Sequence, residues 1–197
     1  MKKAILASSN QHKLEEIQAI LSEFDYELLT LDQVGLGDLE IIEDGETFEE
    51  NSLIKAKAVS ELKGMITLAD DSGLEVDHLN GAPGVYSARY AGEPTDNAAN
   101  NKKLLEALNG VSEPERGARF VTVITMLFED GEKIVVRGEV EGVIGTEEKG
   151  TGGFGYDPLF YVPSIGKTFA ECAPEEKNQL SHRARALIQL KAILADR

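Results

Sequence analysis

Two adjacent carboxylates are the first residues whose type and spacing could do chemistry. Asp70 and Asp71 follow a short apolar run in the stretch LADDSG, and Glu43 lies in an acidic loop earlier in the chain. Hard carboxylate oxygens without a His or Cys neighbour suit Mg²⁺, which binds one or two carboxylates together with substrate phosphates. A bound cation would also relieve the repulsion between neighbouring carboxylates. Taken alone, however, Asp-Ser-Gly is ordinary turn chemistry.

A lysine follows in an unusual place. The stretch SSNQHK, residues 8–13, joins a predicted strand to a predicted helix. Ser8, Ser9 and Asn10 carry side chains that commonly cap a helix N-terminus. Lys13 is harder to explain, because a cation at the positive end of the helix dipole costs about 0.3 to 1 kcal/mol. A phosphate bound at that N-terminus would make the arrangement favourable. For this one lysine, a solvated side chain explains the sequence equally well.

A second helix start repeats the arrangement. In KNQLSHRARA, His182 and Arg183 directly follow the predicted cap Ser181, and Lys177 lies one turn upstream. One unfavourable cation can be a coincidence, but two such helix starts in a strongly acidic protein favour a ligand with several negative charges. With these starts present, the metal interpretation of the carboxylates also gains weight.

The composition limits the class of protein. At 197 residues with 42% hydrophobic content, the chain can bury a full core as a single domain or as two tightly joined lobes. Its formal net charge of −15 argues against a nonspecific DNA or RNA binder, because such binding depends on clustered Lys and Arg. An anionic ligand would have to be met locally by a few basic residues, helix N-termini or a metal.

Cysteine usage and hydropathy indicate the compartment. Cys172 is the one cysteine, which excludes an internal disulfide and a multi-cysteine zinc site, and we expect an ordinary buried thiol. No apolar run approaches the length of a membrane span, and the start MKKAILASSN turns polar too early for a signal-peptide core. We therefore expect a cytoplasmic protein with neither a membrane nor a nucleic-acid partner.

The elements that must position these residues mix two kinds of pattern. Strands are predicted at residues 3–7, 26–31, 65–70 and 74–79, and helices at 13–24, 47–63, 96–109 and from 181 onward. The runs 118–129 and 133–145 predict a long hairpin turning at Asp130-Gly131. Because βα units alternate with a hairpin, we expect an α/β fold with a mixed sheet flanked by helices.

The stretch GTGGFG, residues 150–155, matches the dinucleotide-binding pattern G-x-G-x-x-G. That pattern works only when a helix leaves the glycines, so that the helix N-terminus meets a pyrophosphate. Here YDPLFYVP follows, and its prolines Pro158 and Pro163 predict an extended or turning segment instead. A nicotinamide-dependent dehydrogenase is therefore disfavoured, and the glycines need another reason.

Five stretches taken together resemble the inosine triphosphate pyrophosphatase family. They are SSNQHKLEEI, EDGETFEENSLIKA, ADDSGLEVDHLNGAPGVYSARYAG, GTGGFGYDPLF and EEKNQLSHRARAL. The resemblance spans essentially the whole chain in the right order. Members hydrolyse ITP, dITP and XTP, purine nucleotides of deaminated type, to the monophosphate and pyrophosphate. The resemblance also implies an elongated mixed α/β fold with a deep cleft between two lobes, and a homodimer.

The same resemblance implies a role for each site residue. Glu43 and Asp71 serve Mg²⁺, Asp71 also accepts the proton, and Asp70 either binds metal or supports Asp71. The triphosphate is held by Ser8, Ser9, Asn10, Lys13 and Lys55. The base and sugar end is bound by Ser72, Phe154, Gly155, Tyr156, Asp157, Lys177, His182 and Arg183. Phe154 is expected to stack on the purine, since an aromatic face stacks on any base.

Base selection follows from donors at one end of the substrate. Hypoxanthine and xanthine carry an acceptor oxygen at C6, which Arg183 and a suitably protonated His182 can reach, whereas adenine carries a donor there. Two other classes stay open. A nucleotide-binding module would have no use for the pair Glu43 and Asp71, and a Maf-like pyrophosphatase for pyrimidine or modified nucleotides would need a different base slot.

Overall fold

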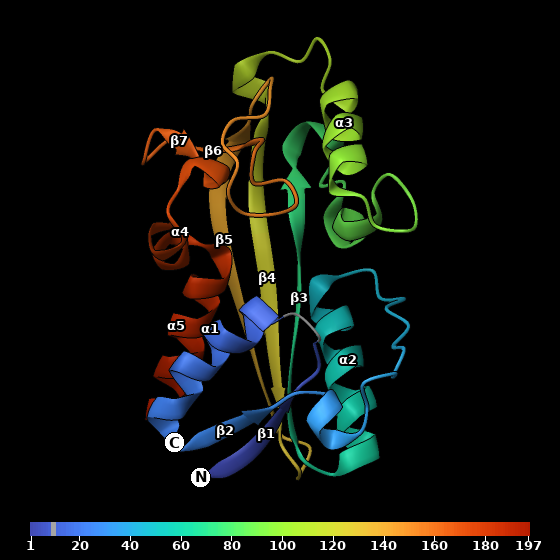
Figure 1. Cartoon of the computed structure of the whole chain (residues 1–197), viewed down its shortest axis with the longest axis vertical. Helices are drawn as coiled ribbons and strands as arrows, with labels where there is room; N and C mark the ends of the chain where they lie inside the picture. The colour runs from blue at the N-terminus through green and yellow to red at the C-terminus, as the bar shows by residue number, and fades with distance from the viewer. Residues whose placement is uncertain (9–10) are drawn as a thin grey trace. The chain divides into compact units, whose positions relative to one another are not determined.

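A seven-stranded mixed sheet, in the order β2-β1-β3-β4-β5-β6-β7, organises the chain (Figure 1). The computed structural model describes residues 1–8 and 11–197, with only the backbone described at positions 11, 12, 16 and 19. The strands are β1 (Lys2–Leu6), β2 (Tyr26–Leu29), β3 (Ile66–Val76), β4 (Gly117–Leu127), β5 (Lys133–Ile144), β6 (Phe160–Val162) and β7 (Lys167–Thr168). The helices are α1 (Gln11–Leu21), α2 (Phe48–Lys63), α3 (Asn97–Ala107), α4 (Pro174–Leu180) and α5 (His182–Ala195). Short 3₁₀ segments cover Ser22–Phe24, Asp32–Val34, Asp77–Leu79, Gly84–Arg89, Glu113–Glu115 and Phe169–Glu171.

Strand direction changes along the sheet. β1 pairs in parallel with both β2 and β3, whereas β5, β6 and β7 pair antiparallel. The predicted hairpin is present, because β4 and β5 are neighbours and the backbone N–H of Phe128 donates to the Glu132 carbonyl at 2.8 Å across the turn. Gly131 adopts φ 88°, the left-handed conformation that this turn requires. The mixed α/β sheet predicted from the sequence is confirmed.

The chain forms two compact units. The first comprises Met1–Asp71, Thr122–Gly138 and Arg185–Arg197, and the second comprises Ser72–Val121 and Glu139–Ala184. The elements β3, β4, β5 and α5 contribute residues to both units.

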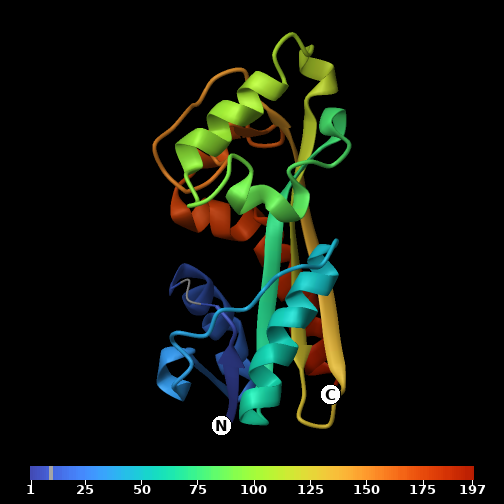
Figure 2. The ribbon, with the colours of Figure 1, turned by 90° about the vertical axis from the view of Figure 1, so that its right-hand side faces the viewer.

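In the first unit, alternate strand residues supply two separate cores. Leu6 and Leu68 belong to the core that includes residues of α1 and α5, whereas Ile5 and Ala69 belong to the core that includes residues of α2. This is the period-two alternation of a strand buried on both faces. Figures 1 and 2 show α2 over one face of these strands and α5 over the other. Odd and even positions of β3 therefore point to different helices.

The second unit has an aromatic core. The ring centroids of Phe120 and Phe160 are 4.5 Å apart, and those of Phe160 and Phe169 are 5.3 Å apart. Cys172 packs against this core and is partly buried rather than fully buried. Its thiol donates to the Thr168 carbonyl at 3.4 Å, and burial raises the pKa of the thiol, so it is a weak nucleophile.

Side chains cap the starts of α2, α3 and α5, and the cap predicted at Ser181 is confirmed. Thr47 Oγ1 accepts a hydrogen bond from the backbone N–H of Glu50 at 3.1 Å at the start of α2. Asp96 and Ser181 accept equivalent bonds at the starts of α3 and α5. Such caps satisfy backbone donors that the first turn leaves without a partner. The helix that begins after Thr47 ends at Lys63, as the sequence predicts.

One strand prediction is wrong. The Asp71-Ser72-Gly73 segment lies inside β3, an uninterrupted strand of 11 residues, and no turn separates residues 65–70 from 74–79. The neighbouring strand β4 is also 11 residues long, so β3 can continue its backbone pairing with β4 beyond Ser72 and Gly73. The Thr122 hydroxyl donates to the Asp71 carbonyl at 3.4 Å within that stretch. Turn propensity is thus overridden by pairing with a long neighbouring strand.

Lys177 also lies in an unexpected position. The sequence placed it just upstream of the helix that Ser181 caps, but it lies in the last turn of the additional short helix α4. A cation is favourable there, because the C-terminal end of a helix dipole is negative. The dipole argument therefore does not apply to Lys177. The segment after GTGGFG contains no helix, which confirms that the dinucleotide-binding pattern lacks its required context.

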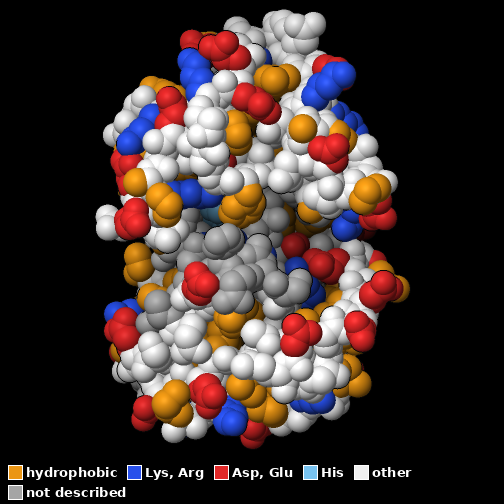
Figure 3. Space-filling view, in the orientation of Figure 1, with side chains coloured by type: hydrophobic (Ala, Val, Ile, Leu, Met, Phe, Trp, Pro, Cys, Tyr) orange, Lys and Arg blue, Asp and Glu red, His pale blue; other side chains and the backbone are white. Residues whose placement is uncertain are grey.

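Charged side chains are dispersed over the face shown in Figure 3, where Lys and Arg lie among acidic and apolar groups. This fits the formal net charge of −15. Within residues 1–8 and 11–197, every helix is too short or too polar to cross a bilayer.

Candidate active site

Asp70 and Asp71 are separated by the strand that carries them. Side chains two residues apart lie on the same side of a strand. Asp70 is therefore on the side of Leu68, which packs toward α1 and α5, and Asp71 is on the side of Ala69, which packs toward α2. Their partners follow this division, because Asp70 pairs with Lys13 of α1 and Asp71 with Lys55 of α2. Adjacent carboxylates therefore meet different cations.

Lys13 has a protein partner that the sequence did not suggest. Its Nζ lies 2.6 Å from Asp70 Oδ2, and the Asp70 side chain is fully buried while that of Lys13 is 18% exposed. A buried carboxylate close to a cation offsets the cost of a lysine in the first turn of α1. The unfavourable cation is thus explained by Asp70, and phosphate binding by Lys13 stays a prediction.

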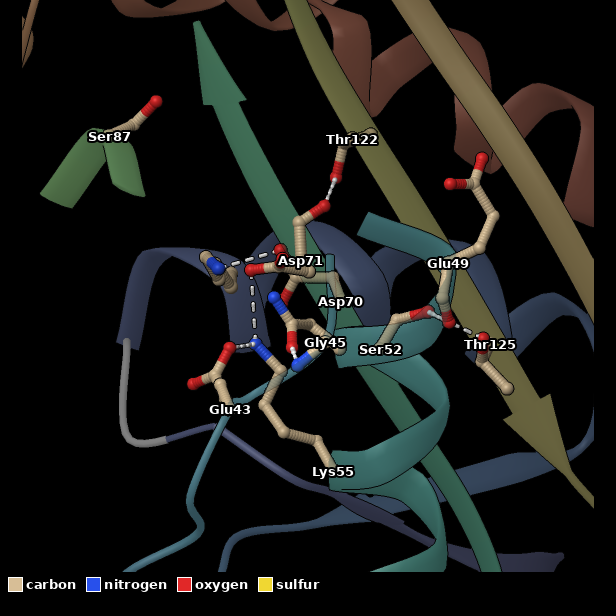
Figure 4. A network of polar contacts seen from close by, with 12 residues as sticks. Glu43, Gly45, Glu49, Ser52, Lys55, Asp70, Asp71, Ser87, Thr122 and Thr125 are labelled. Carbon is tan, nitrogen blue, oxygen red and sulfur yellow. Dashed lines mark hydrogen bonds and ion pairs between the residues drawn. The ribbon is translucent and has the colours of Figure 1, made fainter. Parts of the chain in front are cut away.

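Lys55 joins two carboxylates. Its Nζ lies 2.7 Å from Glu43 Oε2 and 3.3 Å from Asp71 Oδ1 (Figure 4). The side chains of Lys55 and Asp71 are each 12% exposed, and that of Glu43 is 31% exposed. The cap at Thr47 fixes where α2 begins, and this fixes the position along the helix from which the Lys55 side chain projects. Residues far apart in sequence are thereby brought into one charged cluster.

Burial shifts the titration of this cluster. Burial raises the pKa of the Asp71 carboxyl, the Glu43 carboxylate adds to the rise, and Lys55 opposes it without cancelling it. For the Lys55 ammonium, burial lowers the pKa, but attraction to Asp71 and its acidic neighbours outweighs burial and the pKa is raised. Asp71 is therefore a stronger base than an exposed aspartate, and Lys55 stays charged.

Asn51 is a member of this site that sequence reasoning missed. It is 1% exposed, and its Oδ1 accepts the Gly45 backbone N–H at 2.9 Å, which ties the acidic loop to α2. A Cβ at Gly45 would lie 2.7 Å from Asn51 Oδ1, so this approach needs glycine. The Asn51 side chain also opposes the rise in the pKa of the Asp71 carboxyl. The only sequence signal was its place in the first turns of a capped helix, which buried and exposed residues share.

The second unit holds a different cluster around the glycine loop. Asp157 Oδ2 accepts the Phe154 backbone N–H at 2.8 Å and pairs with the Lys177 ammonium. The same ammonium lies 4.6 Å from the centroid of the Phe154 ring. Phe154 is 54% exposed, and a cation at this distance is attracted to the face of the ring. The cluster therefore presents an exposed ring with a fixed charge beside it.

The glycines of GTGGFG are required by close backbone packing. Gly153 has φ 70°, and a Cβ there would lie 2.1 Å from Asp157 Oδ2. Gly150 has φ 84°, and a Cβ there would lie 2.4 Å from the Ala170 carbonyl carbon. These positions exclude any other residue without rearrangement. Close packing of the loop is thus a reason for these glycines other than dinucleotide binding.

Two buried side chains hold this loop in place. Tyr156 is 5% exposed, and its hydroxyl donates to the Ser87 carbonyl at 2.7 Å, so its ring lies in the core. Arg116, which sequence reasoning missed, donates from Nε to the Ile144 carbonyl and from Nη2 to the Gly145 carbonyl, each at 2.7 Å. A buried guanidinium that binds only backbone carbonyls anchors the start of the loop. No motif marks such a role in the sequence.

The remaining predicted residues fall into three groups. His182 and Arg183 begin α5, are 8% and 5% exposed, and the His182 ring stacks on Phe120 with centroids 5.2 Å apart. Ser72 follows Asp71 in β3, and Ser8 follows β1. Ser9 and Asn10 lie outside the described residues.

Glu43 and Asp71 are the acidic side chains that could hold a cation. In the parts of the chain that the structure describes, no three His, Cys, Asp or Glu side chains lie together as a metal-binding group. Glu43 and Asp71, however, share one ammonium, and Asp71 Oδ2 is buried and meets no hydrogen-bond donor among the described residues. Two hard carboxylates fit Mg²⁺ when water and phosphates supply its other ligands. Asp70 is held on the Lys13 side and is not part of this pair.

A model of the Ham1 family matches residues 4–193. The chain belongs to the Ham1 family. Among curated Ham1 relatives, a protein of Clostridium perfringens named dITP/XTP pyrophosphatase is 53% identical, over 97% of this chain and 96% of that protein. One of the same name from Bacillus licheniformis is 48% identical, over 98% of each.

Solved Ham1 structures have the same fold. The Staphylococcus aureus Ham1 protein superposes with a TM-score of 0.93 at 43% identity, covering 99% of each chain. A nucleoside-triphosphatase, dITP/XTP pyrophosphatase, of Mycobacterium abscessus superposes with a TM-score of 0.82 at 44% identity, covering 95% of this chain and 98% of that one. The resemblance drawn from the five sequence stretches is confirmed.

Proposed function

We propose that this Ham1 protein hydrolyses deaminated purine nucleoside triphosphates, ITP, dITP and XTP, to the nucleoside monophosphate and pyrophosphate. Relatives about half identical to it along nearly their whole length carry the name dITP/XTP pyrophosphatase. The structural observation that carries the proposal is the cluster of Glu43, Lys55 and Asp71, with two carboxylates around one buried ammonium. A module that only bound nucleotides would not need a buried carboxylate of raised pKa.

The first unit supplies the groups for phosphate chemistry. Lys13 and Lys55 place ammonium groups that neutralise phosphate oxygens, which is the main protein contribution to phosphoryl-type displacements. Asp71 orients the attacking water and accepts its proton, and burial of its carboxyl makes it a better acceptor at neutral pH. Ser8, with Ser9 and Asn10, completes the predicted phosphate loop.

Glu43 and Asp71 are the residues that would hold Mg²⁺. When bound, Mg²⁺ would neutralise charge on the phosphates and acidify water. Asn51 accepts the Gly45 backbone N–H and so keeps the loop that carries Glu43 in a fixed position relative to Asp71. Asp70 supports the site by holding Lys13.

The second unit supplies the groups for base recognition. The exposed ring of Phe154 offers a stacking surface, and Asp157 fixes both the Phe154 backbone and Lys177. His182 and Arg183 donate to the C6 oxygen of hypoxanthine or xanthine, whereas adenine would leave both without an acceptor. Gly155 and Ser72 would contact the nucleotide beside them. Because the Tyr156 ring lies in the core, its backbone is the part that would face substrate.

The proposal also covers the oligomeric state, the compartment and the domain organisation of the protein. We include in the proposal a homodimer in the cytoplasm, a single functional domain, and a deep cleft for the nucleotide. The compartment rests on cysteine usage and hydropathy, and the dimer and the cleft rest on what the resemblance of the five sequence stretches implies.

A panel of nucleotides tests the function. Purified protein is incubated with ITP, dITP, XTP, GTP, ATP and dTTP, with and without Mg²⁺, and pyrophosphate is quantified. The proposal expects Mg²⁺-dependent pyrophosphate release that is fastest with the deaminated purines. Preference for dTTP would support the Maf-like alternative, and binding without release would support a nucleotide-binding module.

A further inference from the structure

Lys55 holds together the two carboxylates assigned to the cation. The distances from its Nζ are 2.7 Å to Glu43 Oε2 and 3.3 Å to Asp71 Oδ1, and Figure 4 shows the three side chains meeting. The ammonium is confined, because its side chain is only 12% exposed. Both carboxylates therefore already have a positive partner in the protein without ligand.

The charge balance disfavours two cations at this position. Glu43, Asp71 and Lys55 together carry a formal charge of −1, because two carboxylates meet one ammonium. Two like charges a few ångströms apart repel each other strongly where little water screens them. A divalent ion beside an unmoved ammonium would meet roughly twice that repulsion. An ammonium that stayed between the two carboxylates would therefore weaken their binding of a divalent cation.

We infer that Lys55 is the internal counter-ion of the metal site, which holds Glu43 and Asp71 in the free protein and leaves them for substrate phosphates when a divalent cation binds. The inference rests on the proposed function, because the phosphates give the released ammonium its new partner. It makes cation and nucleotide binding mutually dependent. By linkage, the factor by which nucleotide tightens cation binding equals the factor by which the cation tightens nucleotide binding.

Lys13 is not part of this exchange. Its partner is Asp70, whose carboxylate lies on the other face of β3 and is fully buried. That ion pair shares no carboxylate with Glu43 or Asp71. Of these two lysines, Lys55 is the one that pairs with the carboxylates assigned to the cation.

Direct binding of Mn²⁺ to nucleotide-free protein tests the inference. Titration calorimetry compares wild type with Lys55→Met, which keeps the length of the side chain and removes its charge. We expect Lys55→Met to bind Mn²⁺ about tenfold more tightly, within the usual range of coupling between sites. A lysine that served phosphate alone would leave the Mn²⁺ affinity unchanged, and an unchanged or weaker affinity overturns the inference.

Matched control variants exclude other causes of a change in Mn²⁺ affinity. Lys57→Met removes an exposed charge from the same helix, and Lys55→Arg keeps a cation at the site, so both are expected to bind Mn²⁺ no more tightly than wild type. Adding Glu43→Gln to Lys55→Met is expected to abolish the gain, which assigns the tightened binding to this site rather than to other acidic groups. Equal tightening in Lys57→Met would contradict the inference, since it would reflect net charge alone.

A measurement on wild-type protein avoids any folding defect of the variant. Mass spectrometry follows acetylation of Lys55 and Lys57 by acetic anhydride, with and without Mg²⁺ and in the absence of nucleotide. Release from its carboxylates is expected to speed acetylation of Lys55 severalfold while Lys57 is unaffected, and an unchanged Lys55 rate counts against the exchange. Neither readout requires turnover. Failure of the nucleotide panel would overturn the proposed function, whereas normal panel results with unchanged Mn²⁺ binding would overturn only the exchange.

Discussion

Asp70 and Asp71 are neighbours in β3 whose carboxylates pair with lysines from different helices, Lys13 of α1 and Lys55 of α2. The alternation of a strand makes this possible, because consecutive side chains point to opposite faces. One carboxylate is thereby used to hold a lysine in place, and the other is left for chemistry. The two residues should respond differently to substitution, although they are adjacent and of the same type.

Replacement of Asp71 should remove turnover and spare binding. Asp71→Asn keeps the shape of the side chain but removes the proton acceptor, so we expect kcat for dITP to fall by at least about 10³, while the variant still binds nucleotide. Because burial already raises the pKa of the Asp71 carboxyl, the neutral side chain should not lower the melting temperature. Pyrophosphate release and nucleotide binding are measured on the same preparation. Asp77→Asn, an exposed change directly after the same strand, serves as the control.

The pair of Asp70 and Lys13 should be important for stability. Lys13→Met removes the ammonium that pairs with the fully buried Asp70 carboxylate, and we expect a loss of about 3 kcal/mol in the free energy of unfolding. Asp70→Asn removes the carboxylate that pairs with Lys13. Because the Lys13 side chain is 18% exposed and can reach water, the loss in the free energy of unfolding should be smaller. The double variant should lose less than the sum of the two. Urea unfolding measures all three, and additive losses would show that the pair does not couple.

The exposed ring of Phe154 should affect KM rather than kcat. Stacking of a base on an aromatic ring is worth about 1 to 3 kcal/mol, so Phe154→Ala should raise KM for dITP about tenfold. Tyr86→Ala is the matched control, because Tyr86 is 57% exposed and Phe154 is 54% exposed in the same unit. Steady-state kinetics compare the two. A similar rise in KM from both would mean that Phe154 has no special role in stacking.

Arg183 should set the preference for a C6 oxygen. It is 5% exposed at the start of α5. Arg183→Ala should reduce the ratio of kcat/KM for ITP to that for ATP by at least about tenfold, because a donor matched to the C6 oxygen is lost. The exposed Arg185→Ala controls for loss of a nearby charge. Since the ratio is taken within one variant, partial unfolding does not alter it, and an unchanged ratio would move base selection to other residues.

The capping carboxylate Glu171 should make stability depend on acidity. Its Oε2 accepts the Thr168 backbone N–H at 2.8 Å, and this bond lowers the pKa of the Glu171 carboxyl below its usual value. A lowered pKa in the folded state adds stability that is present above the pKa of the unfolded chain and is lost as pH falls through the folded value. Glu171→Gln should therefore flatten the acid side of the melting-temperature profile, and more so than Glu129→Gln, an exposed carboxylate beside the β4–β5 turn. Identical profiles for the two variants would contradict this.

The sequence predicts most elements, because their signals are local. Capping residues mark the starts of α2, α3 and α5, and Asp130-Gly131 marks the hairpin turn. The continuity of β3 could not be predicted, because it depends on pairing with a strand some fifty residues later in the chain. The favourable end of α4 at Lys177 was missed because a helix of seven residues leaves little periodicity.

The candidate site is predicted unevenly for a related reason. Residues with distinctive chemistry, such as Asp71 and Lys55, stand out in short motifs. Asn51 and Arg116 do not, because their role is to bond backbone groups that only the folded chain brings near. The pairing of Lys13 with Asp70 likewise depends on strand parity and on the packing of α1, neither of which any single stretch displays.

Pyrophosphate release from dITP in the presence and absence of Mg²⁺ tests the central claim most directly. Wild-type protein is compared with Asp71→Asn in one assay, with ATP as the competing substrate. The proposed function predicts Mg²⁺-dependent release from dITP by wild type, little release from ATP, and almost none from either by the variant. Equal release from dITP and ATP, or undiminished release by Asp71→Asn, would contradict it.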